Sequence, residues 1–130
     1  MRTAQQHTGD EAEELVARSL TRAGWQIFAR NLRLGRQELD LVALDPGPPP
    51  ELVIVEVRWR ADRAFGLPEE TVDWRKRRQL RRARAQLLDS GLPELVLPRD
   101  LPVRVDLVVV EPPLVGGLPR LRHHRHAIGG

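Results

Sequence analysis

Two acidic residues embedded in apolar, strand-like segments are the side chains of this chain best placed to do chemistry. Asp40 lies in the segment 38–43, Glu-Leu-Asp-Leu-Val-Ala, and Glu56 lies in the segment 52–60, which begins Leu-Val-Ile-Val. An ionised carboxylate is costly to bury without a partner, so each acid requires a compensating group. The pattern therefore indicates a polar site within the apolar segments.

The turn between the two segments predicts how the acids meet. Residues 45–50 read Asp-Pro-Gly-Pro-Pro-Pro, which is too short for a crossover helix, so the flanking segments are expected to form an antiparallel hairpin. A hairpin centred on residue 48 sets Asp40 opposite Glu56, with Cβ atoms roughly 4.5 to 5.5 Å apart. Two carboxylates at that separation repel each other unless one is protonated or a cation lies between them. A divalent metal ion would meet this need.

Side-chain alternation along the second strand brings positive charge to the same place. Glu56, Arg58 and Arg60 are expected to leave one face of this strand. The opposite face carries the valines at positions 53, 55 and 57. Acidic and basic side chains are therefore predicted to converge on one point of the hairpin.

The remaining segments alternate between helix and strand signals. Helices are expected over residues 10–23, ended by Gly24, and over residues 69–89. Strands are expected over residues 25–31 and 101–110, with a short last strand within 118–128. Together with the hairpin, these elements predict one α/β domain over residues 1–130, with a mixed sheet flanked by helices and residues 1–9 as a flexible tail.

The second expected helix carries a lysine on its apolar face. Lys76 is four residues from both Val72 and Leu80, which belong to the stripe expected to pack on the sheet. Two interpretations stay open. Lys76 either points at the acidic pair as a catalytic cation, or reaches solvent from the edge of the stripe.

Arginine dominates the basic residues, which are densest in the segment 75–84. The chain has 21 Lys and Arg against 18 Asp and Glu, a net charge of +3. Because the guanidinium fork matches phosphate oxygens, nucleic acid is the predicted partner. The predicted contacts are Arg60, Arg75, Arg77, Arg78, Arg81 and Arg82. The alternatives are a solvated helix face or a surface that binds an acidic protein.

Composition restricts the class of protein further. A chain of 130 residues can bury a core, and no segment approaches the roughly 18 to 20 apolar residues of a membrane helix. The absence of cysteine excludes disulfides and thiolate ligands, so any metal would bind oxygen or imidazole. A cytoplasmic protein without a membrane partner is expected.

A series of spaced residues resembles the YraN-like family of small bacterial proteins, whose fold is similar to that of restriction endonucleases and Holliday-junction resolvases. The resemblance extends over residues 13–128. The matching residues are Glu13, Gly24, Arg30-Asn31, Glu38-Leu39-Asp40, Val55-Glu56-Val57-Arg58, Phe65-Gly66, Glu70, Val72, Lys76, Leu80, Arg104-Val105-Asp106, His123 and Ala127.

The resemblance implies a restriction-endonuclease-like three-layer core and a metal-dependent endonuclease that acts on DNA, including structured or branched DNA. It further implies that Asp40, Glu56 and the Val57 carbonyl hold Mg²⁺ or Mn²⁺, with Glu13 contributing from its helix. Such ions prefer oxygen ligands, polarise a phosphodiester and lower the pKa of an attacking water. Folds of this type often pair, so a homodimer is expected.

One departure from the family pattern concerns catalysis. Arg58 occupies the position of the family's catalytic lysine. Arginine stays protonated, so it cannot accept a proton, although it can stabilise charge on a phosphate. Two functions follow: an active endonuclease with Asp40, Glu56, Arg58 and Lys76 at its site, or a catalytically impaired nucleic-acid-binding protein that keeps the nuclease fold.

Several residues also have purely structural interpretations. The two acids of the hairpin could be ion-pair partners of Arg58, Arg60 or Arg104, and Asp106 could pair with an arginine. The histidines at 123, 124 and 126 are interpreted as a solvated surface rather than a metal cluster. Two of the tryptophans at 25, 59 and 74 are expected in the core rather than stacked on bases.

Overall fold

The computed structural model of the chain describes residues 4–59, 74–90, 101–111, 113 and 116–126, with the backbone only for residues 4–8, 74–77 and 80. Two helices and five strands lie in these ranges: α1 (Ala4–Arg22), β1 (Gln26–Leu34), β2 (Gln37–Asp45), β3 (Glu51–Trp59), α2 (Trp74–Asp89), β4 (Val103–Glu111) and β5 (Arg120–His124). The strands expected from sequence are all present, and the short last strand is β5.

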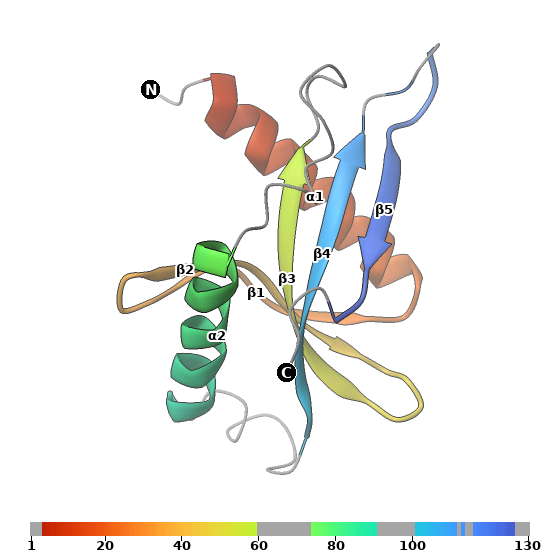
Figure 1. Cartoon of the computed structure of the whole chain (residues 1–130). Helices are drawn as coiled ribbons and strands as arrows, with labels where there is room; N and C mark the ends of the chain where they lie inside the picture. Colours follow the sequence, from red (N-terminus) through yellow and green to blue (C-terminus); the bar gives the residue numbers. More distant parts are fainter. Residues whose placement is uncertain (1–3, 60–73, 91–100, 112, 114–115, 127–130) are drawn as a thin grey trace.

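The strands form one mixed sheet in the order β1-β2-β3-β4-β5. The β3 and β4 strands are parallel, and the other neighbours are antiparallel. Figure 1 shows α1 crossing one face of the sheet and α2 lying against the other. The predicted fold class, an α/β protein with a mixed sheet flanked by helices in three layers, is therefore confirmed.

Each helix covers its own apolar cluster. The α1-side cluster joins Ala12, Val16, Ala17, Leu20 and Trp25 to Leu41, Ala43, Val53, Val55, Val108 and Val110 of the sheet. The α2-side cluster joins Ala83 and Leu87 to Leu39, Val42, Leu52, Ile54 and Val105. The valines at 53, 55 and 57 all meet the α1-side cluster, which confirms the alternation predicted for β3. Trp25 is buried and Trp59 packs against the same cluster, so two tryptophans belong to the core.

Helix α1 begins earlier and ends where expected. It starts at Ala4, so residues 4–9 are helical and the expected start at residue 10 is wrong. Gly9 followed by Asp10 resembles a helix start, but the polar residues before them have adequate helix propensity and contain no proline. At the other end Gly24 has φ +95°, and Trp25 N–H donates to Leu20 C=O over 2.9 Å. This 6→1 bond and the 5→2 bond from Gly24 define a Schellman cap.

Alanine is expected to have opposite effects on stability at Gly9, inside α1, and at Gly24, just after it. Gly24→Ala is expected to lower the free energy of unfolding by about 1 to 2 kcal/mol because an L side chain is strained at positive φ; its Cβ would meet only Pro46 Cγ, at 3.8 Å. Gly9→Ala is expected to raise the free energy of unfolding by about 0.5 to 1 kcal/mol, since Gly9 lies inside α1 and nothing lies within 4 Å of an added Cβ. Urea denaturation of both variants checks this, and equal signs would contradict it.

Helix α2 ends at Asp89 as predicted. Its expected first residues, 69–73, lie outside the described ranges. Ala83 and Leu87 are buried against the sheet, and Arg78, Arg81 and Arg82 are exposed, so the described part of α2 is amphipathic as expected. In the described ranges, neither helix has the length and apolar character needed to span a membrane.

Candidate functional site

The β2–β3 hairpin has the predicted register. Its pairs run from Asp45↔Glu51 to Leu41↔Val55, which is a hairpin centred on residue 48. Asp40 and Glu56 are the next residues on the two strands, so they lie at the position where the ladder stops. There the Asp40 side chain replaces a backbone group: its Oδ2 accepts a hydrogen bond from Val57 N–H over 2.9 Å.

The neighbouring β1–β2 hairpin changes face at the same level. Leu39 belongs to the α2-side cluster and Leu41 to the α1-side cluster, although strict alternation would put both on one face. On β1, Arg30 pairs with Glu14 of α1, whereas Leu32 packs on the α2 side. The break in alternation therefore lies at Asp40 on β2 and at Asn31 on β1. It explains why the Asp40 side chain points toward the β3 backbone.

The two acids of the pair act on each other electrostatically. Burial is the main cause that raises the pKa of Asp40 to about 8, and the Glu56 and Glu13 charges raise it further, while the Val57 N–H lowers it. Glu56 is 7% exposed. A proton on Asp40 at neutral pH, or a cation in its place, would relieve the repulsion between these carboxylates.

Glu13 joins the pair from α1. Burial raises the pKa of Glu13, and its hydrogen bonds with Asn31 and Asp40 lower it, while the nearby Glu38 and Glu56 charges raise it. The structure thus brings Glu13 within electrostatic reach of Asp40 and Glu56, the two other predicted acidic residues of the site. It does so with elements far apart in the sequence, because α1 packs across β2 and β3.

Arg58 lies beside Glu56, as alternation predicted. Its Nε is 3.7 Å from Glu56 Oε1, an ion-pair distance too long for a hydrogen bond, and the Arg58 side chain is 34% exposed. In the described part of the structure, this buried Nε has no hydrogen-bond partner. The structural alternative of a Glu56–Arg58 ion pair is therefore confirmed, and Arg58 still borders the acidic pair with part of its side chain open to solvent.

The donor set of the hairpin suits a hard cation held by few ligands. In the described residues, no group of three or more His, Cys, Asp or Glu side chains is arranged to hold a metal ion. Mg²⁺ commonly uses about one or two protein carboxylates and keeps several waters. Asp40 and Glu56 provide two carboxylates, and the Val57 backbone lies beside Asp40, since its N–H donates to Asp40 Oδ2. The residues present fit a Mg²⁺ or Mn²⁺ ion bound in this way.

Some predicted site residues are not described. Arg60 lies outside the described ranges, and so do the side chains of Lys76, Arg75 and Arg77. Their proposed contacts stay predictions.

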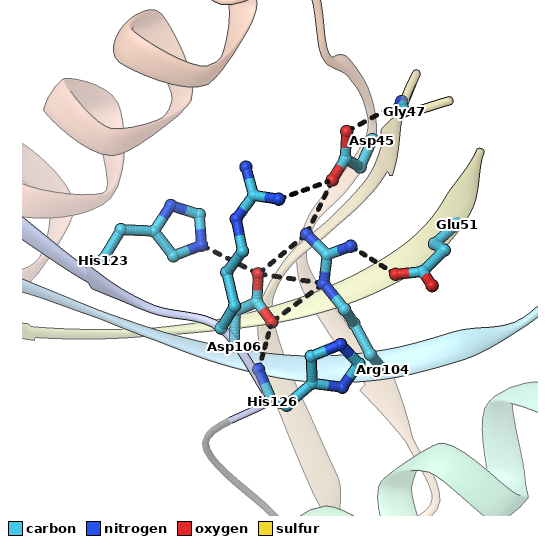
Figure 2. A network of polar contacts seen from close by, with 8 residues as sticks. Asp45, Gly47, Glu51, Arg104, Asp106, His123 and His126 are labelled. Atoms are coloured by element: carbon cyan, nitrogen blue, oxygen red, sulfur yellow. Dashed lines mark hydrogen bonds and ion pairs between the residues drawn. The ribbon is translucent and has the colours of Figure 1, made fainter. Parts of the chain in front are cut away.

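Sequence reasoning missed a buried polar network on the α1 side of the sheet (Figure 2). Arg104, 7% exposed, donates to Asp45 Oδ2 over 2.7 Å, to Glu51 and to Asp106 Oδ1 over 3.1 Å. Its guanidinium also lies 5.4 Å from the centre of the Trp25 ring. Arg104 is therefore not the partner of Asp40 or Glu56. The spacing of Arg104 and Asp106, which puts both on one face of a strand, was the sequence feature that could have indicated this network. Asp45 and Glu51 gave no indication of it beyond their positions at the turn.

Asp106 is the fully buried centre of this network. It accepts hydrogen bonds from Arg104, from His126 N–H over 3.0 Å and from His123 Nε2 over 2.8 Å. Burial raises the pKa of Asp106, but the hydrogen bonds from His123 and Arg104 outweigh it and hold this pKa below its usual value. The structural interpretation of Asp106 is confirmed. His123 serves the network as a partner of Asp106, and no metal cluster is found at the described histidines.

Fold and site together define an α/β protein with a restriction-endonuclease-like core and an acidic hairpin. Residues 12–110 match the model of a protein family described as "Uncharacterised protein family UPF0102". The chain belongs to this family, which is the YraN family, and the predicted resemblance is confirmed.

Relatives from distant bacteria match most of the chain. A UPF0102 protein of Porphyromonas gingivalis is 36% identical over 119 residues, which are 92% of this chain and 82% of the relative. A UPF0102 protein of Xanthomonas campestris pv. campestris is 42% identical over 117 residues, 88% of this chain and 90% of the relative. One from Symbiobacterium thermophilum is 39% identical over 104 residues, 80% of this chain and 81% of the relative.

Proposed function

We propose that this protein is a metal-dependent endonuclease that hydrolyses phosphodiester bonds in DNA, including structured or branched DNA. The observation that carries the proposal is the Asp40–Glu56 pair at the end of the hairpin ladder, where burial and the Glu56 charge raise the pKa of Asp40 to about 8. An acid with a strongly raised pKa beside a second carboxylate is typical of sites where charge is used for chemistry.

Each side chain of the site has a distinct part in this proposal. Asp40, Glu56 and the Val57 carbonyl would hold Mg²⁺ or Mn²⁺, with Glu13 beside them. When bound, the ion would polarise the phosphodiester and lower the pKa of a water. Arg58 would stabilise negative charge that develops on the phosphate, because it borders Glu56 and is partly exposed. A guanidinium cannot accept the proton of the water, so a carboxylate of the site or solvent would take it.

The exposed face of α2 supports a polyanionic substrate. Arg78, Arg81 and Arg82 are exposed on it, and the proposed contacts extend to Arg60, Arg75 and Arg77. Phosphate contacts of this kind position a nucleic acid without reading its sequence. In the proposed complex, two copies of the chain would face the two strands of a duplex.

Arg58 favours a second function, a nucleic-acid-binding protein that keeps the nuclease fold without turnover. Arg58 forms an ion pair with Glu56, and this neutralises part of the negative charge that would attract a metal ion. In this case DNA binding would persist without metal and would weaken steeply with salt.

Cleavage of labelled duplex, single-stranded and four-way-junction DNA with Mg²⁺ or Mn²⁺ distinguishes the two functions. Wild type is expected to cut, and Asp40→Asn to reduce the rate by about 100-fold or more, since it removes a metal ligand but keeps an acceptor for Val57 N–H. Arg58→Lys is expected to retain or raise activity. Binding without cutting by wild type and by Arg58→Lys would overturn the endonuclease and leave the binding protein.

A further inference from the structure

The last strand of the sheet, β5, carries an arginine on the face opposite α1. Figure 1 shows β5 beside β4 at one side of the sheet. Leu121 packs against the α1-side cluster, and His123 belongs to the buried polar network on that side. Because side chains alternate along a strand, Arg122 leaves the other face of the sheet, the face on which α2 packs.

The register sets Arg122 in line with Arg58. Arg58 is paired with Val109 in the parallel β3–β4 ladder, and Val109 is paired with Arg122 in the antiparallel β4–β5 ladder. Arg58 leaves the same face as Arg122, since Val57 beside it packs against the α1-side cluster. Neighbouring strands lie about 4.7 to 4.9 Å apart, so the Cα atoms of the two arginines are about 9 to 10 Å apart.

The two arginines lie beyond the part of this face that α2 covers. The buried residues of the α2-side cluster extend to Ile54 on β3 and to Val105 on β4. The arginines are in line with Val109, four residues further along β4. Their side chains are partly open to solvent, 34% exposed for Arg58 and 28% for Arg122. A ligand at the surface can therefore reach both arginines from the same side of the sheet.

Each of these arginines is held by a buried glutamate. Arg58 pairs with Glu56, and Arg122 pairs through its Nε with Glu111 Oε1. The carboxylate restricts the direction of a guanidinium, whose five N–H donors form a rigid fork that matches phosphate oxygens. Phosphates follow one another along a DNA strand at a rise of about 3.4 Å along the axis. A strand that passes Arg58 thus brings further phosphates toward Arg122.

We propose that Arg122 is a second phosphate-binding residue of the acidic site, which holds a nucleic-acid strand beside the phosphate that Arg58 contacts. The inference rests on the proposed nucleic-acid substrate and extends its site from the β2–β3 hairpin onto β5. Unlike the contacts proposed on α2, Arg122 lies on the sheet itself, in line with the cation that borders the acidic pair. The contact is to the phosphate backbone and is independent of base sequence.

Binding of fluorescently labelled duplex DNA to the full-length chain in EDTA, measured by anisotropy at several salt concentrations, tests this role without requiring cleavage. Loss of Arg122 alone would leave the buried Glu111 without this partner, so Glu111→Gln is compared with the double variant Glu111→Gln/Arg122→Gln. The double variant is expected to bind DNA about 10-fold more weakly, the effect of one charged hydrogen-bonding group. The slope of log K against log salt concentration is expected to become shallower by about one.

The matched control pair is Glu14→Gln and Glu14→Gln/Arg18→Gln, which changes the same charges in an ion pair on α1, across the sheet. These two variants are expected to bind DNA with nearly equal affinity and slope. An equally large loss on removing Arg18 would overturn the inference, since net charge alone would explain both effects.

The remaining outcomes separate this inference from the proposed activity. Equal affinity and slope in the two Glu111 variants would overturn the inference and show that Arg122 only neutralises Glu111. Absence of DNA binding by wild type would overturn the nucleic-acid substrate and this inference with it. Binding that depends on Arg122, without cleavage in Mg²⁺ or Mn²⁺, would overturn the endonuclease and support the phosphate contact.

Discussion

Arg104→Met is expected to lower the free energy of unfolding by about 3 to 5 kcal/mol, the effect typical of removing one partner from a buried ion network. Methionine keeps the length of the side chain but leaves Asp106, which is fully buried, and Asp45, 6% exposed, without their cation. Arg104→Lys is expected to recover only part of the loss, because one ammonium cannot reach three carboxylates that a guanidinium fork contacts. Urea denaturation at pH 7 measures both effects.

Arg125→Met is the matched control for this prediction. Arg125 lies 3.7 Å from Asp45, one of the same carboxylates, but its side chain is 61% exposed. Its loss is expected to change stability little, since an exposed ion pair is screened by solvent. A loss in Arg125→Met as large as that in Arg104→Met would show that burial does not decide the strength of this network.

The network also predicts how stability falls in acid. Hydrogen bonds from the Gly47 N–H and from Arg104 outweigh burial and hold the pKa of Asp45 below its usual value. Hydrogen bonds from His123 and Arg104 do the same for Asp106. An acid with a lowered folded-state pKa contributes stability above its unfolded pKa, about 4, and this contribution is lost as the pH falls through the folded value.

Asp40→Asn is expected to stabilise the metal-free protein, with a gain that grows from about pH 4 to about pH 8. Burial and the Glu56 charge raise the Asp40 pKa from 3.8 to about 8, so the folded state holds a proton that the unfolded state releases in this range. The folded state is thus favoured by this group below the unfolded pKa and loses that advantage as pH rises to the folded pKa. Asparagine stays neutral, and the gain at pH 8 is expected to be on the order of 5 kcal/mol.

Thermal or urea denaturation of wild type and Asp40→Asn from pH 4 to pH 9 checks this prediction. In a Glu56→Gln background the gain from Asp40→Asn is expected to shrink, because the Glu56 charge is one cause of the raised pKa. Mn²⁺ at pH 8 is expected to stabilise wild type and not Asp40→Asn. A gain independent of pH would mean that Asp40 is ionised in the folded protein throughout.

Local patterns in the sequence were sufficient for the hairpin and its acids. The turn formers after Asp45 and the alternation along β3 predicted the register that sets Asp40 opposite Glu56, because side-chain period and loop length leave little freedom in a hairpin. The same reasoning placed Arg58 beside Glu56 and predicted the glycine cap at Gly24.

Local patterns could not predict contacts between side chains that are far apart in the sequence. Nothing near Glu13 indicates that α1 would bring it to Asp40, and the match to the family pattern alone had suggested it. In the sequence, Asp45, Glu51 and Arg104 likewise look like unrelated surface or strand residues. Their contacts could not be predicted because they join the turn, β3 and β4, which are far apart in the chain. The start of α1 was also misplaced, because a polar helix end carries no hydrophobic periodicity.

The sequence by itself determined the order of the elements, the α/β class, the hairpin register and the pairing of two acids, all of which depend on short-range periodicity and turn chemistry. Only the tertiary structure decided which charges are neutralised. It assigns Arg104 to Asp45, Glu51 and Asp106, and it buries Asp40 beside the Glu56 charge, which raises the pKa of Asp40. The physical reason is that burial and Coulomb interactions depend on distances through space, which are fixed when α1 and the twisted β1–β2 hairpin pack against β3.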